Sequence, residues 1–75
     1  MKELVEYMAR SLVNNPDQVE VIEVDGTRSV ILELRVAQED MGRVIGKGGR
    51  VANAMRTLLR VAAAKQGTRA ILGIV

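Results

Sequence analysis

Cysteine and histidine are both absent from the 75 residues of this chain. Their absence excludes disulfide bonds and the common zinc sites, which are built from these side chains. Without histidine, the candidate general bases are nine carboxylates, and all of them lie at or before residue 40. The only two serines, Ser11 and Ser29, have no base at a suggestive spacing. We therefore expect no catalysis, no metal and no other cofactor.

Aromatic residues are almost as scarce, because Tyr7 is the only one. Modules that stack bases on exposed aromatic side chains, such as the RRM and the OB fold, are therefore excluded. The core must consist of aliphatic residues and methionine. A chain this short buries little apolar surface, and without disulfides or a metal we expect self-association to help stabilise it.

Long hydrophobic runs are also missing, and none approaches the length of a membrane-spanning segment. Glu3 and Glu6 place acidic residues too early for a signal peptide. The sequence thus predicts a soluble, cytoplasmic protein that does not enter a membrane.

Acidic residues are missing altogether from the second half of the chain. Up to Asp40 there are four basic and nine acidic residues, a net charge of −5. From Met41 onward there are seven basic residues and no acidic one, a net charge of +7. Such asymmetry indicates a surface that binds a polyanion. From charge alone, an alternative stays open: a solvated helix face whose arginines pair with acids of the first half.

Apolar residues at three- and four-residue spacing predict helices over 2–14, 39–45 and 50–65. Gln38 to Asp40 offer capping chemistry for the short helix, and Glu39 and Asp40 are interpreted as solvated residues at its start. The buried stripe of the long helix is expected to follow Val51, Met55, Leu58 and Ala62, widened by Ala52, Leu59 and Ala63.

Period-two alternation predicts a strand over 30–36, and apolar runs predict strands over 19–24 and 70–75. Asp25-Gly26 is a hairpin turn signal between the first two strands. The run 19–24 alternates poorly, which either a bulge or burial on both faces would explain. The elements together predict one α+β domain over residues 1–75.

The stretch Gly46-Lys47-Gly48-Gly49 separates the last two helices. A nucleotide P-loop is excluded because the spacing is one residue short and the magnesium-binding hydroxyl is missing. A dinucleotide fingerprint is excluded because Val51 stands where its third glycine belongs. A plain tight turn remains possible, but three glycines carry an entropic cost that is better explained by close approach of a ligand to the backbone. The backbone amides at the start of the following helix carry partial positive charge, and Lys47 and Arg50 add full charges. This combination favours a clamp for a phosphodiester backbone.

The run Val44-Ile45-Gly46-Lys47-Gly48-Gly49-Arg50 resembles the signature of the K-homology (KH) domain, in which a GxxG loop joins two helices and clamps about four nucleotides. The resemblance extends over the whole chain. It implies the type II KH fold, α-β-β-α-α-β, with a three-stranded sheet packed against three helices. In its length and in the run from Asp40 to Arg50, the chain is most similar to the KhpA family of small bacterial KH-domain proteins.

This resemblance implies a cytoplasmic protein that binds single-stranded RNA, acts as an RNA chaperone or post-transcriptional regulator, and affects cell shape and envelope growth. It also implies a homodimer and a partner similar to KhpB, a larger RNA-binding protein with its own KH domain. An adaptor that uses the fold mainly to dimerise is the alternative.

Phosphates are expected to meet Lys47, Arg50 and the amides of Gly48 and Gly49, in the loop that Gly46 opens. An aliphatic groove for bases is expected from Val44, Ile45 and Val51, although Ile45 could equally belong to the core. Further contacts are expected from three residues flanking the loop, Arg43, Asn53 and Arg56.

Overall fold

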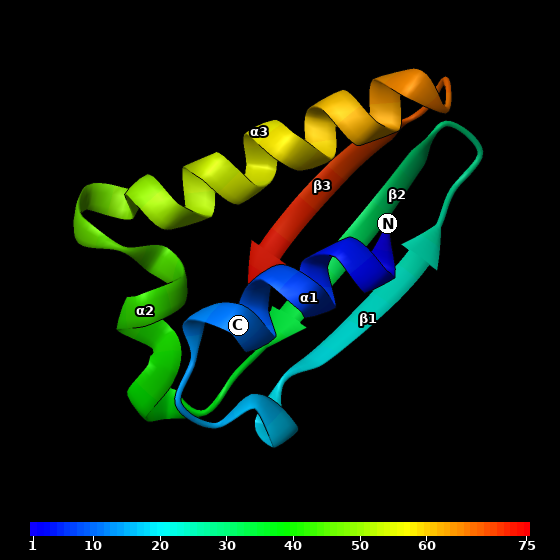
Figure 1. Ribbon diagram of the computed structural model, residues 1–75. Coiled ribbons are helices and arrows are strands. Elements are labelled where there is room, and N and C mark those ends of the chain that lie inside the picture. Colours follow the sequence, from blue (N-terminus) through cyan, green and yellow to red (C-terminus); the bar gives the residue numbers. More distant parts are fainter.

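The computed structural model describes residues 1–75, and its elements follow the predicted α-β-β-α-α-β order (Figure 1). The helices are α1 (Lys2–Leu12), α2 (Met41–Ile45) and α3 (Arg50–Lys65). The strands are β1 (Glu20–Asp25), β2 (Ser29–Arg35) and β3 (Arg69–Ile74). Single 3₁₀ turns lie at Pro16–Gln18, Gln38–Asp40 and Lys47–Gly49. No helix has the combination of length and apolar character needed to cross a membrane.

The strands form one mixed sheet in the order β1-β2-β3. β1 and β2 are an antiparallel hairpin, whereas β2 and β3 are parallel. Two parallel strands start at the same end of the sheet, so the chain must cross back to that end before the second strand can begin. Here α2 and α3 make that return, and the glycine loop lies between them, at the far end of α3 from the start of β3 (Figure 1).

The helices cover one face of the sheet. Val5 and Ala9 of α1, Val44 of α2 and Leu59 of α3 are buried against the inward-facing side chains of the strands, among them Leu32. On the opposite face, apolar residues of all three strands are exposed: Ile22, Val24, Ile31 and Ile71. The β1–β2 register is one-to-one throughout. The poor alternation in β1 therefore reflects neither a bulge nor burial on both faces; both explanations offered from the sequence are wrong.

The buried stripe of α3 differs from the predicted one. Ala52, Met55, Leu59 and Ala63 are buried. Leu58, predicted at the centre of the stripe, is 53% exposed. The helix packs on β3, so its buried side is turned toward the sheet and away from α1. Leu58 consequently borders a gap between α1 and α3 instead of the core.

The first helix ends at Leu12 and not at residue 14, because Val13 is extended (φ −100°, ψ 162°). The backbone amides of Asn14 and Asn15 then donate to the carboxylate of Asp40. Asp40 provides no side-chain cap for α2. It joins the end of α1 to the start of α2, and the predicted capping role is wrong.

Candidate nucleic-acid interface

The loop between α2 and α3 has a backbone that requires glycine. Gly46, Gly48 and Gly49 all have positive φ angles, of 77°, 64° and 82°. A Cβ atom on Gly46 would lie 2.6 Å from Val51 Cγ2 and 2.8 Å from Val51 N, so no side chain fits there. At Gly48 a Cβ would meet nothing within 4 Å. The loop is thus packed tightly at its base and open at its tip, where a ligand can approach the backbone.

The loop amides differ in availability. The Gly49 N–H donates to the Gly46 carbonyl (3.1 Å), and the Arg50 N–H donates to the Lys47 carbonyl. The Gly49 amide, one of the two predicted to meet phosphate, is therefore already engaged within the loop. No side chain caps the start of α3, so the positive end of its dipole faces the loop.

Cationic and polar side chains extend from the loop along one flank of α3. Lys47 and Arg50 are exposed at the loop and at the start of the helix, and Arg43 is exposed on α2. Arg56 is held in place, since its Nε donates to the Leu72 carbonyl of β3 (3.3 Å) and its Nη1 to Asn53 Oδ1 (3.3 Å). This flank therefore faces the edge strand β3.

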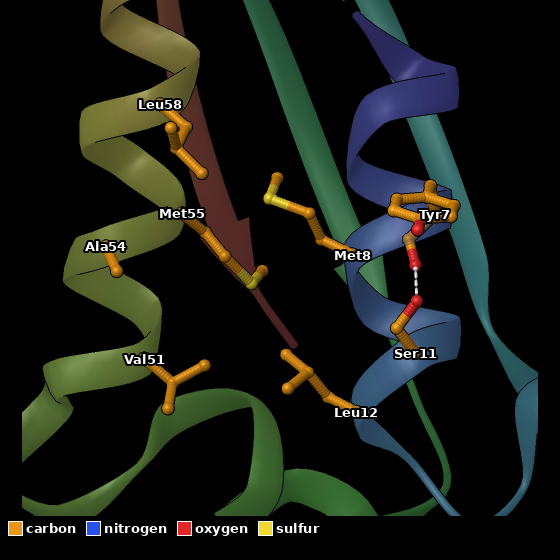
Figure 2. Close-up of a pocket in the computed structure, with 8 residues that line it drawn as sticks. All are labelled: Tyr7, Met8, Ser11, Leu12, Val51, Ala54, Met55 and Leu58. Atoms are coloured by element: carbon orange, nitrogen blue, oxygen red, sulfur yellow. Dashed lines mark hydrogen bonds between the residues drawn. The ribbon is translucent and has the colours of Figure 1, made fainter.

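The three aliphatic residues predicted to line a groove are separated in the structure. Val44 is fully buried in the core, so its side chain supports α2 from beneath and is closed to a ligand. Val51 points toward α1, on the other side of α3 from Asn53 and Arg56 (Figure 2). Of the three, Ile45 is exposed, with 36% of its surface accessible, whereas Val51 is half-buried and faces α1. Sequence spacing gives the helix but not its rotation on the sheet, which decides these positions.

The basic residues of the second half are not neutralised by acids. Ion pairs within 4 Å involve only Met1, Glu3, Glu6, Arg10, Glu20, Glu33 and Arg35. None of the seven basic residues from Arg43 to Arg69 makes one. The charge alternative left open by the sequence, a face paired with acids of the first half, is therefore wrong, and these cations are available to a polyanion.

Asp40 is the only buried charged residue and lies one helical turn before the interface. Its carboxylate accepts hydrogen bonds from the amides of Asn14 (3.1 Å) and Asn15 (3.0 Å) and from Asn15 Nδ2 (2.9 Å). Burial alone would raise the pKa of Asp40, but these hydrogen bonds and the charge of Arg43 outweigh burial and lower it. The interpretation as a solvated residue is wrong, and no periodicity marks Asp40 as buried. No acidic cluster suited to a metal ion is present.

An apolar hollow lies between α1 and α3 (Figure 2). Its volume is about 320 Å³, and seven of its eight lining residues are hydrophobic. The side chains of Leu12 and Val51 lie at its end near the glycine loop, and Leu58 lies at the other end. Tyr7 borders it while remaining 73% exposed. The molecule thus presents a cationic flank and an apolar hollow on opposite sides of the same helix.

Comparison with known proteins agrees with this geometry. Residues 2–74 match the family model of the KhpA/KhpB KH domain. No solved structure matches the chain. The element order and mixed sheet described above are those of a type II KH domain.

Curated relatives are similar over their whole length. The chain is 55% identical to the RNA-binding protein KhpA of Clostridium acetobutylicum, with all of both chains covered. It is 56% identical to that of Caldanaerobacter subterraneus subsp. tengcongensis, again with full coverage of both. The protein of the same name from Aquifex aeolicus is 46% identical, over 99% of this chain and 94% of its own.

Proposed function

The chain belongs to the KhpA/KhpB KH-domain family, and from that premise we propose that residues 1–75 form one KH domain that binds single-stranded RNA in the cytoplasm. The observation that carries the proposal is a glycine loop that is open at its tip and flanked by cations without acidic partners. RNA-binding is a non-catalytic function, and it is the one named for the relatives of this chain.

In the proposed complex, the phosphate backbone crosses the loop. Lys47 and Arg50 supply charge, and the amide of Gly48 donates to a phosphate oxygen, because the Gly49 amide is already engaged. Arg43, Asn53 and Arg56 flank the strand, and Ile45 contacts a base. One such clamp meets about four nucleotides. We therefore expect micromolar affinity and weak sequence preference, in keeping with the small contact area.

The test replaces both Lys47 and Gly48 by Asp and measures binding of a five-nucleotide RNA by fluorescence anisotropy. The two new anions lie where phosphates are proposed to sit, so affinity should fall at least tenfold, about 1.4 kcal/mol or more. The chain offers a matched control in Lys65→Asp with Gly67→Asp. Gly67, like Gly48, has a positive φ (70°) and open space around its Cα.

The control changes the net charge and the backbone strain equally but lies at the other end of α3. It should bind the short RNA within about twofold of the unmodified protein. Equal affinity for the loop variant and the unmodified protein, with both folded by circular dichroism, would refute the clamp.

At the cellular level we propose a role as RNA chaperone or post-transcriptional regulator with an effect on cell shape and envelope growth, as the family resemblance implies. We propose a KhpB-like protein as its partner on the same ground. Crosslinking in cells, followed by sequencing of bound RNA and identification of co-purified proteins, tests both. If neither RNA nor such a partner were recovered, both proposals would be contradicted.

We also propose that the protein forms a homodimer through the hollow between α1 and α3. Exposed apolar side chains of both helices meet there, and contact between two copies would bury them. This position lies beside the glycine loop, so two clamps would come together and RNA binding would gain avidity without new contacts.

Leu58→Glu tests the dimer by placing a charge in the hollow, with Ile31→Glu as a matched control. Leu58 and Ile31 are exposed to similar extents, 53% and 48%, but Ile31 lies on the open face of the sheet. Sedimentation equilibrium over a hundredfold concentration range should find dimers for the control and only the 8.2 kDa monomer for Leu58→Glu. Dimers for Leu58→Glu but only monomers for Ile31→Glu would place the interface on the open face of the sheet. Monomers for both variants and for the unmodified protein would exclude self-association. An adaptor without an RNA role would keep the dimer and show no salt-dependent RNA affinity.

A further inference from the structure

Another hollow lies at the end of α3 that is remote from the glycine loop. Its volume is about 280 Å³, and its walls come from the last turns of α3, the turn that follows and the start of β3: Arg60, Ala64, Thr68, Arg69 and Ala70. Two guanidinium groups and one hydroxyl are thus the polar side chains at its edge. None of the residues predicted from the sequence to contact RNA lies in it.

Both arginines have unused hydrogen-bonding capacity. Neither the Arg60 nor the Arg69 side chain makes an ion pair or a hydrogen bond within the chain. Arg10, Arg35 and Arg56 have partners, whereas Arg28, Arg43 and Arg50 have none, so what distinguishes Arg60 and Arg69 is the hollow that they share. A guanidinium matches the geometry of a phosphate with two parallel N–H donors, so a pair of free ones around a hollow suits a phosphate group.

The helix end itself does not require these cations. The carbonyl of Ala63 accepts hydrogen bonds from the amides of Gln66 and Thr68, both at 3.0 Å, and that of Ala64 accepts from Gly67 at 3.1 Å. Two of the last carbonyls of α3, those of Ala63 and Ala64, are therefore satisfied by the turn that follows. A capping role for Arg60 or Arg69 would duplicate bonds that the backbone already makes.

The hollow is aligned with the clamp. Asn53, Arg56 and Arg60 recur at intervals of three and four residues, which places them on one flank of α3. That flank faces β3, because Arg56 donates to the Leu72 carbonyl and Arg60 shares the hollow with Arg69. Arg50 and Arg60 are ten residues apart, about 15 Å along the helix axis. A strand that keeps the helical stacking rise of 3.4 Å per nucleotide, the form assumed here, covers this distance with about four phosphates.

We infer that Arg60, Arg69 and Thr68 form a second phosphate-binding site, which receives the same RNA strand after it has crossed the glycine loop. The strand follows the seam between α3 and β3, and its footprint grows from about four nucleotides to about eight. This inference rests on the proposed RNA-binding function and extends it from a single clamp to a two-point track. Length of the RNA, more than its sequence, then decides affinity.

The experiment compares a four-nucleotide and a ten-nucleotide oligouridylate in fluorescence anisotropy. The unmodified protein should bind the longer RNA at least tenfold more tightly. Replacing both Arg60 and Arg69 by Gln should remove that gain while leaving affinity for the short RNA within twofold. The salt slope for the long RNA should also become shallower by about 1.4, at about 0.7 for each lost phosphate contact.

A control variant, Lys2→Gln with Arg10→Gln, loses the same charge from α1 and should keep the preference for the long RNA. Arg60→Lys with Arg69→Lys should keep part of it, since lysine retains the charge but not the paired donors. Urea midpoints verify that every variant is folded. The inference is overturned if the Gln variant binds the long RNA as the unmodified protein does. If the Lys47→Asp, Gly48→Asp variant binds both RNAs normally, the proposed function itself fails.

Discussion

Gly46 shows how one residue links the packing of the domain to its binding loop. Its φ of 77° and ψ of 171° lie in a region that only glycine occupies readily. Its Cα also faces the side chain and backbone nitrogen of Val51, at the start of α3. Gly48 shares the positive φ but faces open space. The first glycine is required for packing, and the second leaves the tip of the loop uncovered.

Alanine at these two glycines should therefore have different effects. We expect Gly48→Ala to lower the free energy of unfolding by about 1 kcal/mol, the cost of a left-handed conformation. Gly46→Ala adds a steric clash with Val51 and should lower it by about 2 to 4 kcal/mol. Urea denaturation measures both, and equal losses would show that Val51 can move away from residue 46.

The carboxylate of Asp40 makes stability depend on pH. In the folded state hydrogen bonds from Asn14 and Asn15 lower its pKa, whereas in the unfolded chain the value returns to about 3.9. The unfolded state then binds the proton more readily. The stabilisation is complete above the unfolded pKa and is lost as the pH falls through the folded one.

We accordingly expect the urea concentration at the unfolding midpoint to decrease as the pH is lowered from about 5 to about 2. In the Asp40→Asn variant, the part of this decrease that Asp40 causes should be absent. The variant should also be less stable at neutral pH, because an amide cannot accept all three hydrogen bonds. Glu23→Gln, at an exposed carboxylate that makes no hydrogen bond or ion pair, serves as the control and should follow the unmodified protein. An unchanged pH profile in Asp40→Asn would exclude Asp40 as the source.

The elements were predictable from the sequence to a large extent, and their rotations were not. The order of helices and strands and the bounds of α3 follow from periodicity and glycine. The poor alternation of β1 could not be interpreted, because a three-stranded sheet with helices on one face only leaves Ile22 and Val24 exposed. The resemblance to KH domains implied that Val44 and Val51 help to line a groove, but tertiary packing buries the first and turns the second toward α1. Asp40 went unrecognised because its partners lie 25 and 26 residues away.

Two positions on β2 that are three residues apart should report the two faces of the sheet. Leu34 is fully buried, whereas Ile31 is exposed on the open face. Leu34→Ala should lower the free energy of unfolding by about 2 to 5 kcal/mol through the cavity it leaves. Ile31→Ala should cost about 1 kcal/mol or less. Chemical denaturation at two protein concentrations checks this, and a large, concentration-dependent loss for Ile31→Ala would mean that a second copy covers the open face.

At the scale of the whole molecule, charge is segregated along with structure. The acids lie in α1, in the β1–β2 hairpin and in the 3₁₀ turns Pro16–Gln18 and Gln38–Asp40, and the ion pairs of the chain are found in α1 and the hairpin. The seven cations of the second half, none of which makes an ion pair, lie on the crossover, mainly on α3, and at the start of β3. A net charge of only +2 therefore conceals a surface with one strongly basic side.

Binding should consequently depend strongly on salt despite the small net charge. For a five-nucleotide RNA we expect the logarithm of affinity to fall with the logarithm of salt concentration with a slope of about −2 to −3, from three or four phosphate contacts at about −0.7 each. Anisotropy titrations between low and physiological salt measure the slope. A value near zero would mean that the basic side is only solvated.

The parallel pairing of β2 with β3 also has a consequence for the time course of folding. Ile31 pairs with Ile71, so this contact closes a loop of about 40 residues, whereas the β1–β2 hairpin and the turns of α3 need only near neighbours. Local contacts form quickly, and distant ones wait until the entropy of closure has been overcome. We expect the hairpin and α3 to form early and the docking of β3 to limit the rate. Until β3 docks, the seam along α3 has no second wall, so the nascent fold acquires its glycine turn before it acquires a surface along which a strand of RNA could lie.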